Sequence, residues 1–381
     1  MIFSTPNHIP RVKLVIETSR GYGQSLLRGI ASYAREFGPW SFIQDPNFYL
    51  APSKRTARET DSESIDGIIA HTDDASLVNQ LMEMDVPMVM KGITQLPTDI
   101  PTIRSNDLEI GKIAADNLIS LGFHNLGFCG YRNMYWSKRR RQGFAQRASS
   151  ADIEIAHTNE TNPKKLKRWL TSLPKPVGIL ACNDDRCRQV IRCALENGLA
   201  IPDEVAVLGV DNDEMVCELA EFPLSSIAVA NERVGYEAAK LLHQMMQGEK
   251  PAGQQIVAEP LYVVQRLSTD TLAIDDTAVR KALYFIQDEI PKDIAVDDVV
   301  NKMQMSRRMA EIRFRKATGK SINQQVMSLR IRLVRELLIE TTLPIEIIAR
   351  KAGFSSSAYM GMKFKAETGM APSKYRSNHS V

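Results

Sequence analysis

Short apolar runs alternate with helical stretches along residues 11–267 of the chain. The runs include VKLVIE, GILAC and VAVLGV, and they lie at 12–17, 66–70, 87–92, 125–130, 178–182, 205–210 and 227–230. Segments with helical periodicity separate them, for example at 24–37 and 77–84. Short buried strands that alternate with helices predict parallel sheets covered by helices on both faces. We therefore expect an α/β fold with doubly wound parallel sheets here.

Polar residues follow several of these predicted strands. They lie in the segments SRGYG (19–23), SND (105–107), NDD (183–185) and DND (211–213). In an open α/β sheet, the loops that leave the carboxyl ends of the strands line the crevice in which ligands bind. Polar groups at these positions predict a site for a small polar ligand.

The pattern changes near residue 268, where a polar segment is followed by helical periodicity up to the end of the chain. We expect one domain at 11–268, a linker at 269–277 and an all-helical domain at 278–377. A chain of 381 residues is too long for one ordinary hydrophobic core, which agrees with two or three domains.

The helical region contains one unit twice, about 50 residues apart. The corresponding pairs are Val299 and Ile348, Gln304 and Gly353, Ser306 and Ser356, Phe314 and Phe364, and Gly319 and Gly369. Gly353 suits a tight turn between two helices because glycine enters left-handed backbone conformations freely. The paired serines predict N-caps of the second helix, and the paired glycines predict its end. A helix at 321–339 is expected to connect the copies.

A helix, a tight turn and a capped helix form a helix-turn-helix unit, which places its second helix in the DNA major groove. The charge supports this reading. Residues 278–381 hold 19 Lys and Arg and 10 Asp and Glu, a net +9, whereas residues 1–277 carry 29 and 35, a net −6. A basic domain on an acidic body is typical of polyanion binding. Two recognition helices in successive major grooves would lie about 34 Å apart.

The helical domain resembles the DNA-binding domain of the AraC/XylS family. The matching residues are Gly353, Phe354, Ser356, Phe364, Gly369, Pro372, Tyr375 and Arg376. The first copy departs from the family pattern, since Gln304 replaces the usual turn glycine and Ala310 replaces a larger apolar residue. We expect the first copy to pack less tightly for this reason.

The resemblance also implies which residues contact DNA. Base contacts fall on Arg308, Glu311 and Ile312 in the first copy, and on Ser357, Ala358, Gly361 and Met362 in the second. Arginine pairs with guanine, glutamate accepts from cytosine, and apolar groups suit thymine methyls. The capping residues Ser306 and Ser356 belong to the same surface. Phosphate contacts are assigned to Arg307, Arg313, Arg315, Lys363 and Lys365, for each of which a solvated surface position is the alternative.

Residues 11–267 resemble the periplasmic-binding-protein-like domain of LacI-type repressors. The matching pieces are SNDLEIGKIAADNLISLGFHNLGFCG, RRRQGF, ILACNDDRCRQVIRCALENGLAIPDEVAVLGVDND and LSSIAVANERVGYEAAKLLHQMM. A LacI-like sensor followed by an AraC-like DNA-binding domain is the architecture of the xylose operon regulator family. The resemblance implies a sugar-responsive transcription regulator, an activator, that binds D-xylose or a related sugar.

When the ligand-binding positions of this family are carried over to the sequence, the resemblance implies a ligand site that includes Asn106, Asp107, Arg140, Asn183, Asp184 and Asp211. Carboxylates accept hydrogen bonds from sugar hydroxyls, while Arg and Asn donate them. Tyr22 and Trp136 are candidate aromatic platforms for the sugar ring, and packing is the alternative for Trp136. Helix capping is the alternative for Asp184 and Asp211. Arg139 and Arg141 flank Arg140, which leaves a phosphorylated sugar open as a ligand.

The remaining expectations concern partners and location. We expect operator DNA, RNA polymerase and a second copy of the chain as partners, and neither a cofactor nor a metal. Five cysteines without zinc-ligand spacing and an N-terminus without an export-signal pattern indicate a reduced, cytoplasmic protein with no membrane partner. The alternatives are an enzyme, although the chain lacks a complete phosphate-binding or nucleophile motif, and a constitutive DNA-binding protein with a degenerate sensor.

Overall fold

A computed structural model describes residues 8–44, 65–72, 75–91, 100–251, 253–270, 276–290 and 294–379. The chain forms two compact units. The first consists of Met1–Asn106 and Ala230–Glu259, and the second of Asp107–Val229 and Pro260–Ser380. Within the described residues, the chain therefore passes between the units three times, at 106–107, 229–230 and 259–260. No helix in the described ranges is long and apolar enough to span a membrane.

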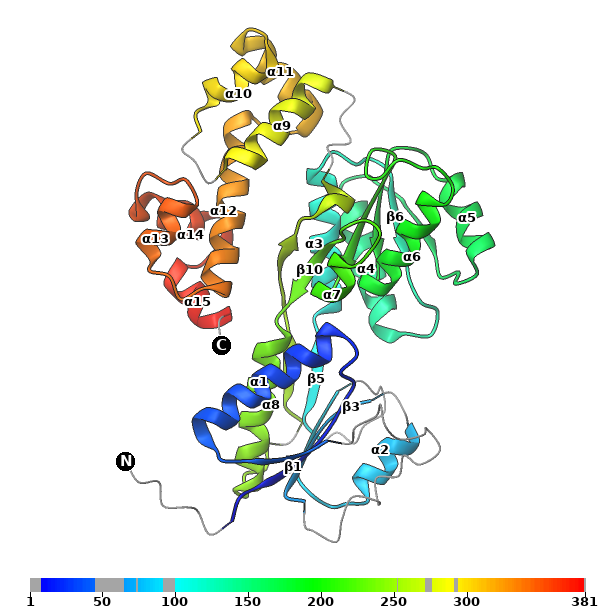
Figure 1. Cartoon of the computed structure of the whole chain (residues 1–381), viewed down its shortest axis with the longest axis vertical. Coiled ribbons are helices and arrows are strands. Elements are labelled where there is room, and N and C mark those ends of the chain that lie inside the picture. The colour runs from blue at the N-terminus through cyan, green and yellow to red at the C-terminus, as the bar shows by residue number, and fades with distance from the viewer. Residues whose placement is uncertain are drawn as a thin grey trace. The chain divides into compact units, whose positions relative to one another are not determined.

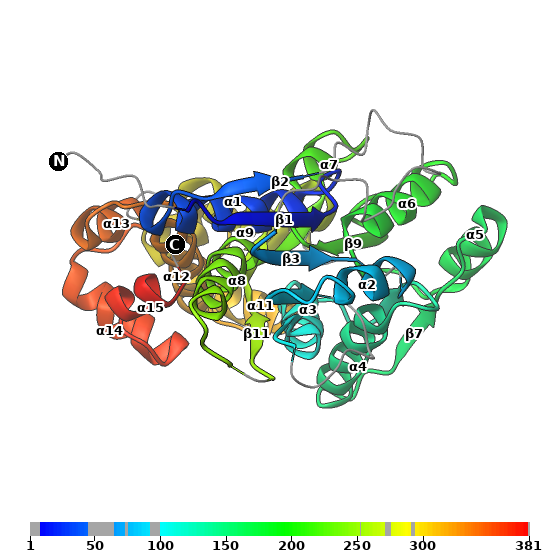
Figure 2. The same ribbon diagram turned by 90° about the horizontal axis from the view of Figure 1, so that it is seen from below.

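The first unit is built on a six-stranded, entirely parallel sheet with the order β11-β5-β4-β3-β1-β2. Residues Ile68 and Ala70 of β3 pack with α2, whereas Gly67 of the same strand faces Leu242 of α8. Figures 1 and 2 show β1 and β3 side by side in this sheet. The elements are β1 (Arg11–Ile16), α1 (Gly21–Phe37), β2 (Ser41–Ile43), β3 (Gly67–His71), α2 (Ala75–Met82), β4 (Met88–Lys91), β5 (Thr102–Ser105), α8 (Asn231–Met246) and β11 (Gln255–Ala258).

The α/β part of the second unit has a six-stranded sheet with the order β12-β10-β9-β8-β6-β7. The prediction of parallel sheets needs one correction here, because β12 runs antiparallel to β10. The elements are α3 (Asp107–Ser120), β6 (Leu126–Cys129), α4 (Tyr135–Ser149), β7 (Ile155–Thr158), α5 (Pro163–Ser172), β8 (Val177–Ala181), α6 (Asp184–Leu195), β9 (Val205–Val210), α7 (Glu214–Glu218), β10 (Ser225–Val229), β12 (Pro260–Val264) and the 3₁₀ helix η2 (Leu267–Thr269).

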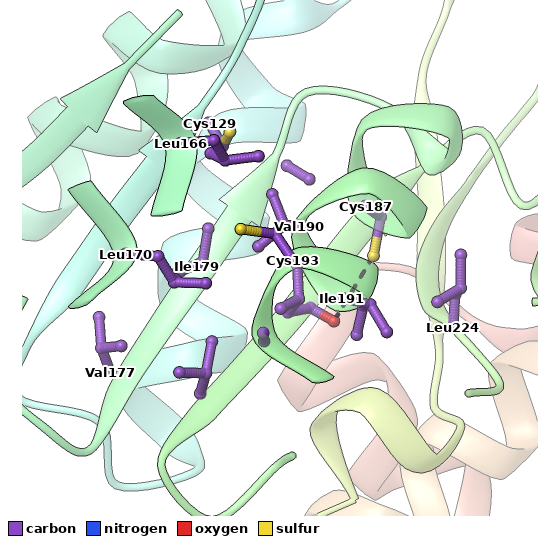
Figure 3. Close-up of a cluster of buried hydrophobic side chains, with 14 of the residues drawn as sticks. Cys129, Leu166, Leu170, Val177, Ile179, Cys187, Val190, Ile191, Cys193 and Leu224 are labelled. Atoms are coloured by element: carbon purple, nitrogen blue, oxygen red, sulfur yellow. Dashed lines mark hydrogen bonds between the residues drawn. The ribbon is translucent and has the colours of Figure 1, made fainter. Parts of the chain in front are cut away.

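Cysteines help to fill the core of this sheet. Figure 3 shows Cys129, Cys187 and Cys193 among leucine, isoleucine and valine side chains of β8, α5 and α6. The Sγ atom of Cys187 lies 3.9 Å from the carbonyl oxygen of Val207. All five cysteines are free and buried. This agrees with the prediction of reduced packing thiols, which behave as small apolar side chains.

The helical tail, residues 276–379, is organised around α12. The first half of α12 contributes Ile322, Val326 and Leu329 to a core with α9, α10 and α11. Its second half contributes Val334 and Leu338 to a separate core with α13, α14 and α15, and Figure 1 shows both groups along this helix. The elements are α9 (Thr277–Glu289), α10 (Val296–Met303), α11 (Arg307–Thr318), α12 (Ile322–Glu340), α13 (Ile345–Lys351), α14 (Ser357–Thr368) and α15 (Pro372–His379).

The ends of the predicted linker (269–277) belong to ordered elements. Thr269 is fully buried in η2, where its hydroxyl donates to Ser225 Oγ of β10 at 2.6 Å. Asp276 is the N-cap of α9, and Thr277 is the first residue of that helix. The structure thus shortens the stretch that could act as a linker to 270–275, of which residues 271–275 lie outside the described ranges.

Candidate ligand site and candidate nucleic-acid interface

Arg140 lies where α3 and α4 cross at very short range. The crossing depends on glycine. A Cβ on Gly111 would lie 2.1 Å from the carbonyl oxygen of Arg140, and one on Gly143 would lie 1.9 Å from that of Leu108. Because glycine has no side chain at these two positions, the start of α3 can lie directly against the middle of α4. This packing brings Asp107 next to Arg140, 33 residues further along the chain.

The guanidinium of Arg140 joins three segments of the second unit. It donates to Asp107 Oδ1 at 3.0 Å, to the carbonyl oxygen of Cys182 at 2.6 Å and to Asp211 Oδ1 at 3.3 Å. Burial by itself would lower the pKa of Arg140, but the two carboxylates outweigh burial and the pKa is raised. Arg140 therefore stays charged. Its side chain is 5% exposed, whereas that of Asp211 is 24% exposed, so Asp211 is the member that can reach a ligand.

Asp211 begins a turn with an uncommon backbone. Its φ is 101° and that of Asn212 is 48°, so two consecutive non-glycine residues occupy the left-handed half of conformational space. Such residues cost about 1–3 kcal/mol each and persist where surrounding contacts hold them. Here the contacts are Arg140 on Asp211, and Ser226 Oγ, which accepts from the backbone N–H of Asn212 at 3.0 Å.

Asn183 and Asp184 differ in how far internal contacts occupy them. Asn183 Oδ1 accepts from the N–H of Arg186 at 2.9 Å and caps α6, which leaves the amide donors of Asn183 unused by the cap. Asp184 is 3% exposed and accepts from Ser226 Oγ at 2.5 Å and from the N–H of Asp213 at 2.8 Å. Burial, and then the charge of Asp211, raise the pKa of Asp184 to about 8. Its role in this geometry is to brace the turn at 211–213.

Trp136 lies beside the Arg140 cluster. The Arg140 Cζ atom is 5.0 Å from the centre of the Trp136 ring, within the range of a cation–π contact. Tyr131 packs edge-on against the same ring at 6.2 Å. Trp136 thus packs against the cluster and is half-buried, and its role as a platform for a sugar ring stays a prediction.

Within the first unit, Tyr22 and Asn106 follow the carboxyl ends of parallel strands. Lys91 Nζ lies 3.4 Å from the centre of the Tyr22 ring, and the His71 ring packs edge-on against Tyr22 at 4.8 Å. Burial, followed by the charge of Lys91, lowers the pKa of His71 to about 3, so His71 is neutral at physiological pH. Asn106 Nδ2 donates to Glu259 Oε2 at 2.8 Å.

The structure thus brings together Asp107, Arg140 and Asp211, with Trp136 beside them. Asp184 lies against the turn at 211–213, where it accepts from the N–H of Asp213. Sequence reasoning missed His71, Lys91, Glu259 and Ser226. Of these, His71 and Lys91 are the last residues of β3 and β4, and they lie at or next to the ends of the predicted apolar runs 66–70 and 87–92, so their position at a strand's carboxyl end was a usable signal. Ser226 lies inside the buried strand β10, and nothing in its local sequence marks it.

The helix-turn-helix geometry of the tail follows the predicted signals closely. Gln304 takes the left-handed conformation (φ 53°) at the turn after α10, as Gly353 does (φ 72°) after α13. Ser306 Oγ accepts from the N–H of Met309 and caps α11, and Ser356 Oγ accepts from that of Tyr359 and caps α14. Gly319 and Gly369 end the two recognition helices in the left-handed conformation.

Both recognition helices expose apolar side chains at equivalent positions. The exposed fractions are 48% for Met309, 52% for Ile312, 39% for Tyr359 and 58% for Met362. Gly361 borders open space, because a Cβ atom added to it would have no other atom within 4 Å. Ile312, Met362 and Gly361 were predicted as base contacts, whereas Met309 and Tyr359 were not. Among the other predicted DNA contacts, the exposed residues are Arg308, Arg315, Ala358 and Lys365, and the half-buried ones are Glu311, Ser357 and Lys363. The Nζ atom of Lys363 lies 5.5 Å from the centre of the Tyr359 ring.

Two of the arginines assigned to phosphate have carboxylate partners within the chain. Arg307 Nη1 donates to Asp297 Oδ1 at 2.9 Å, and both side chains are mostly exposed. Arg313 holds Asp276 with two hydrogen bonds, of 2.5 and 2.6 Å. The same carboxylate caps α9. Arg313 therefore fastens the recognition helix α11 to the start of the tail, and a phosphate would have to compete with Asp276 for it.

Comparison with known proteins defines the class of this chain. Residues 115–269 match the family described as a periplasmic binding protein-like domain, and residues 299–378 match a helix-turn-helix domain. The chain is therefore a transcription regulator that joins a periplasmic-binding-protein-like sensor to a DNA-binding domain of the AraC type.

Relatives that are similar over the whole chain include xylose regulators. The xylose operon regulatory proteins of Haemophilus influenzae and Escherichia coli are each 28% identical to it, over 97% of this chain and 98% and 97% of their own lengths. The solved structure of a xylose-binding transcription activator is similar over 97% of this chain and 98% of its own, with a TM-score of 0.60 and 26% identity. A cellobiose-bound regulator shares the sensor fold over 68% of this chain, with a TM-score of 0.53 and 22% identity.

Proposed function

We propose that this chain is a sugar-responsive transcription activator that binds D-xylose or a closely related sugar in its sensor and operator DNA through both helix-turn-helix units. The observation that carries the proposal is the similarity to xylose regulators over both domains in one continuous alignment. The protein acts in the cytoplasm as a homodimer and recruits RNA polymerase.

The polar groups of the second unit suit a sugar. Asp211 is the accessible acceptor for a hydroxyl, Asn183 retains amide donors, and Trp136 offers an aromatic face. Arg140 acts as a positioning residue, because its buried guanidinium fixes Asp107 and Asp211 rather than pointing to solvent. This balance of charge favours a neutral ligand over a phosphorylated one, since the cation of Arg140 already has two carboxylate partners.

The test begins with an operator selected from random duplexes by the full-length chain. Its dissociation constant is then measured by fluorescence anisotropy without sugar and with D-xylose, L-arabinose, D-ribose or D-xylulose 5-phosphate. We expect D-xylose to change operator affinity by about 5–150-fold, the usual range of allosteric coupling. Equal affinity with every sugar would remove the sensing function, and failure to select any duplex would remove DNA binding.

A pair of variants tests the site within the same assay. Arg140→Lys keeps the positive charge but loses the planar guanidinium, so D-xylose affinity measured by calorimetry should fall by roughly 10-fold or more, equivalent to the loss of one charge-assisted hydrogen bond. Arg139→Lys is the matched control, because Arg139 contacts Gln142 on the surface of the same helix. Equal affinities for the two variants would show that the sugar binds elsewhere.

A further inference from the structure

A chain of contacts in the second unit leads from the candidate ligand site to the helix that joins the two DNA-reading units. It starts at Asp211, which accepts from Arg140, and continues through the neighbouring residue Asn212. Asn212 Oδ1 accepts from Arg266 Nη1 at 3.0 Å. The next residue back along the chain is Gln265, whose Oε1 accepts from Arg332 Nη1 of α12 at 2.6 Å.

Arg266 holds its position through many bonds. Its Nε donates to Glu218 Oε1 at 2.6 Å, its Nη1 also donates to the carbonyl oxygen of Leu224 at 2.9 Å, and its backbone N–H donates to Ser225 Oγ at 2.8 Å. The side chain is only 12% exposed. A change in the position of Asn212 therefore alters the bonds of Arg266 in a packed environment, where side chains transmit displacement rather than absorb it.

The turn at Asp211–Asn212 is suited to having two arrangements. Both residues have positive φ values, and polar partners hold both of them in place. A ligand that hydrogen-bonds to Asp211 competes with Arg140 for the carboxylate that steadies this backbone. Strain held by removable contacts is a means by which a local event can switch a structure.

We propose that Arg266 is a positioning residue that transmits the state of the Asp211–Asn212 turn to α12 through Gln265 and Arg332. The inference rests on the proposed function, because it names the route by which the sugar site regulates DNA binding. Since α12 carries one helix-turn-helix core on each of its halves, a shift at Arg332 changes how the two recognition helices are presented to DNA.

The test uses the full-length chain with Arg266→Gln, Asn212→Gly and the double variant. Asn212→Gly removes the acceptor for Arg266 and adds no backbone strain at positive φ. The matched control is Arg192→Gln, because Arg192 makes a similar pair with Glu221 on the surface of the same unit, and its hydrogen bonds within the described ranges go to Glu221 and not to the route. For each protein, the D-xylose dissociation constant is measured by calorimetry, and operator affinity is measured with and without D-xylose.

We expect Arg266→Gln and Asn212→Gly to leave the D-xylose dissociation constant within about threefold of the wild-type value. The coupling factor, which is the ratio of the operator affinities measured with and without D-xylose, should fall at least about fivefold towards 1. The double variant should lose no more coupling than either single one, because both act on one route. A merely structural role would lower stability without this split. If the wild-type chain and Arg266→Gln respond equally to D-xylose, the route is wrong although the sensing function stands.

A second readout does not depend on the effector. Backbone hydrogen exchange in the sugar-free chain should become faster around Arg332 in Arg266→Gln and in Asn212→Gly, and should not change in Arg192→Gln. If the wild-type chain fails to respond to D-xylose, the proposed sugar is wrong, and the exchange measurement still decides the route. Exchange in α12 that is unchanged in both route variants overturns the inference.

Discussion

The two helix-turn-helix units of the tail use the same folding signals and expose different chemistry. Serine caps each recognition helix and glycine ends it, and Phe314 and Phe364 occupy equivalent, fully buried positions. Both helices expose two apolar side chains at equivalent positions, but α11 sets Arg307, Arg308 and Arg315 around them, whereas α14 sets Ala358, Gly361 and Lys365 there. A repeated fold thus keeps its caps and core, which stability requires, while its surface is free to read different bases.

The turns of the two helix-turn-helix units differ in their central residue, and the fold forms with either one. Gln304 adopts the same left-handed conformation as Gly353 although its Cβ makes that conformation costly. Ala310 is fully buried, as is Met360 at the equivalent position of the second unit. The first unit therefore tolerates a weaker turn residue and a smaller core residue. Its recognition helix is also held by the Arg313–Asp276 pair, at a position where the second unit has Lys363.

The largest expected effect comes from the two core phenylalanines. Phe314→Ala and Phe364→Ala should each destabilise the tail by about 3–5 kcal/mol, because each leaves a cavity in a buried cluster. Hydrogen exchange on the full-length chain should show faster exchange in α9–α11 for the first variant and in α13–α15 for the second, since the cores are separate. Equal loss of protection in both groups would show that the units unfold as one.

DNA binding should distinguish the recognition helices. Arg308→Ala should weaken operator binding by about 1–3 kcal/mol, the value of a good base contact, and relax the preference at one position. Met362→Ala should have a smaller effect, which thymine-to-uracil substitution in the operator should reproduce because uracil lacks the methyl group. If uracil substitution has no effect at any position while Met362→Ala weakens binding, the side chain does not read thymine.

The caps should contribute equally in the two units. Ser306→Ala and Ser356→Ala should each cost about 1 kcal/mol of stability, because each removes the acceptor for one backbone N–H at a helix start. Urea denaturation measures the loss. Ser377→Ala is a control on a serine outside both caps, and its hydroxyl contacts only the Lys374 carbonyl among the bonds of the described residues.

The smallest expected effect concerns the turns. Gln304→Gly should stabilise the first unit by up to about 1 kcal/mol, because glycine reaches positive φ without strain. Gly353→Ala should destabilise the second unit by a similar amount, as it introduces the strain that the first unit already bears. A destabilised Gln304→Gly chain would mean that the Gln304 side chain makes a contribution larger than the strain.

The sequence predicted the folding of the tail better than that of the sheets. Caps, turns and helix ends are local signals, and each was found where predicted. Strands β2, β5, β7, β11 and β12 were missed. Strands such as TIRS and QIVA contain polar residues and show no long apolar run, whereas β12 (PLYVV) is continuously apolar and carried a usable signal. The reversed direction of β12 was also missed, since direction depends on where the chain returns and not on the strand's own residues.

The sequence by itself determined the two-part organisation, the duplicated helical unit with its caps, and the polar residue types at the carboxyl ends of the strands. These depend on periodicity and on backbone preferences within a few residues. Tertiary structure alone decided that Arg140 orients Asp107 and Asp211, that Asp184 braces a turn, that Arg313 holds Asp276, and that Arg266 lies between the candidate ligand site and α12. Each of these pairs residues about 30–70 positions apart, and only the packed chain brings such residues within hydrogen-bonding distance.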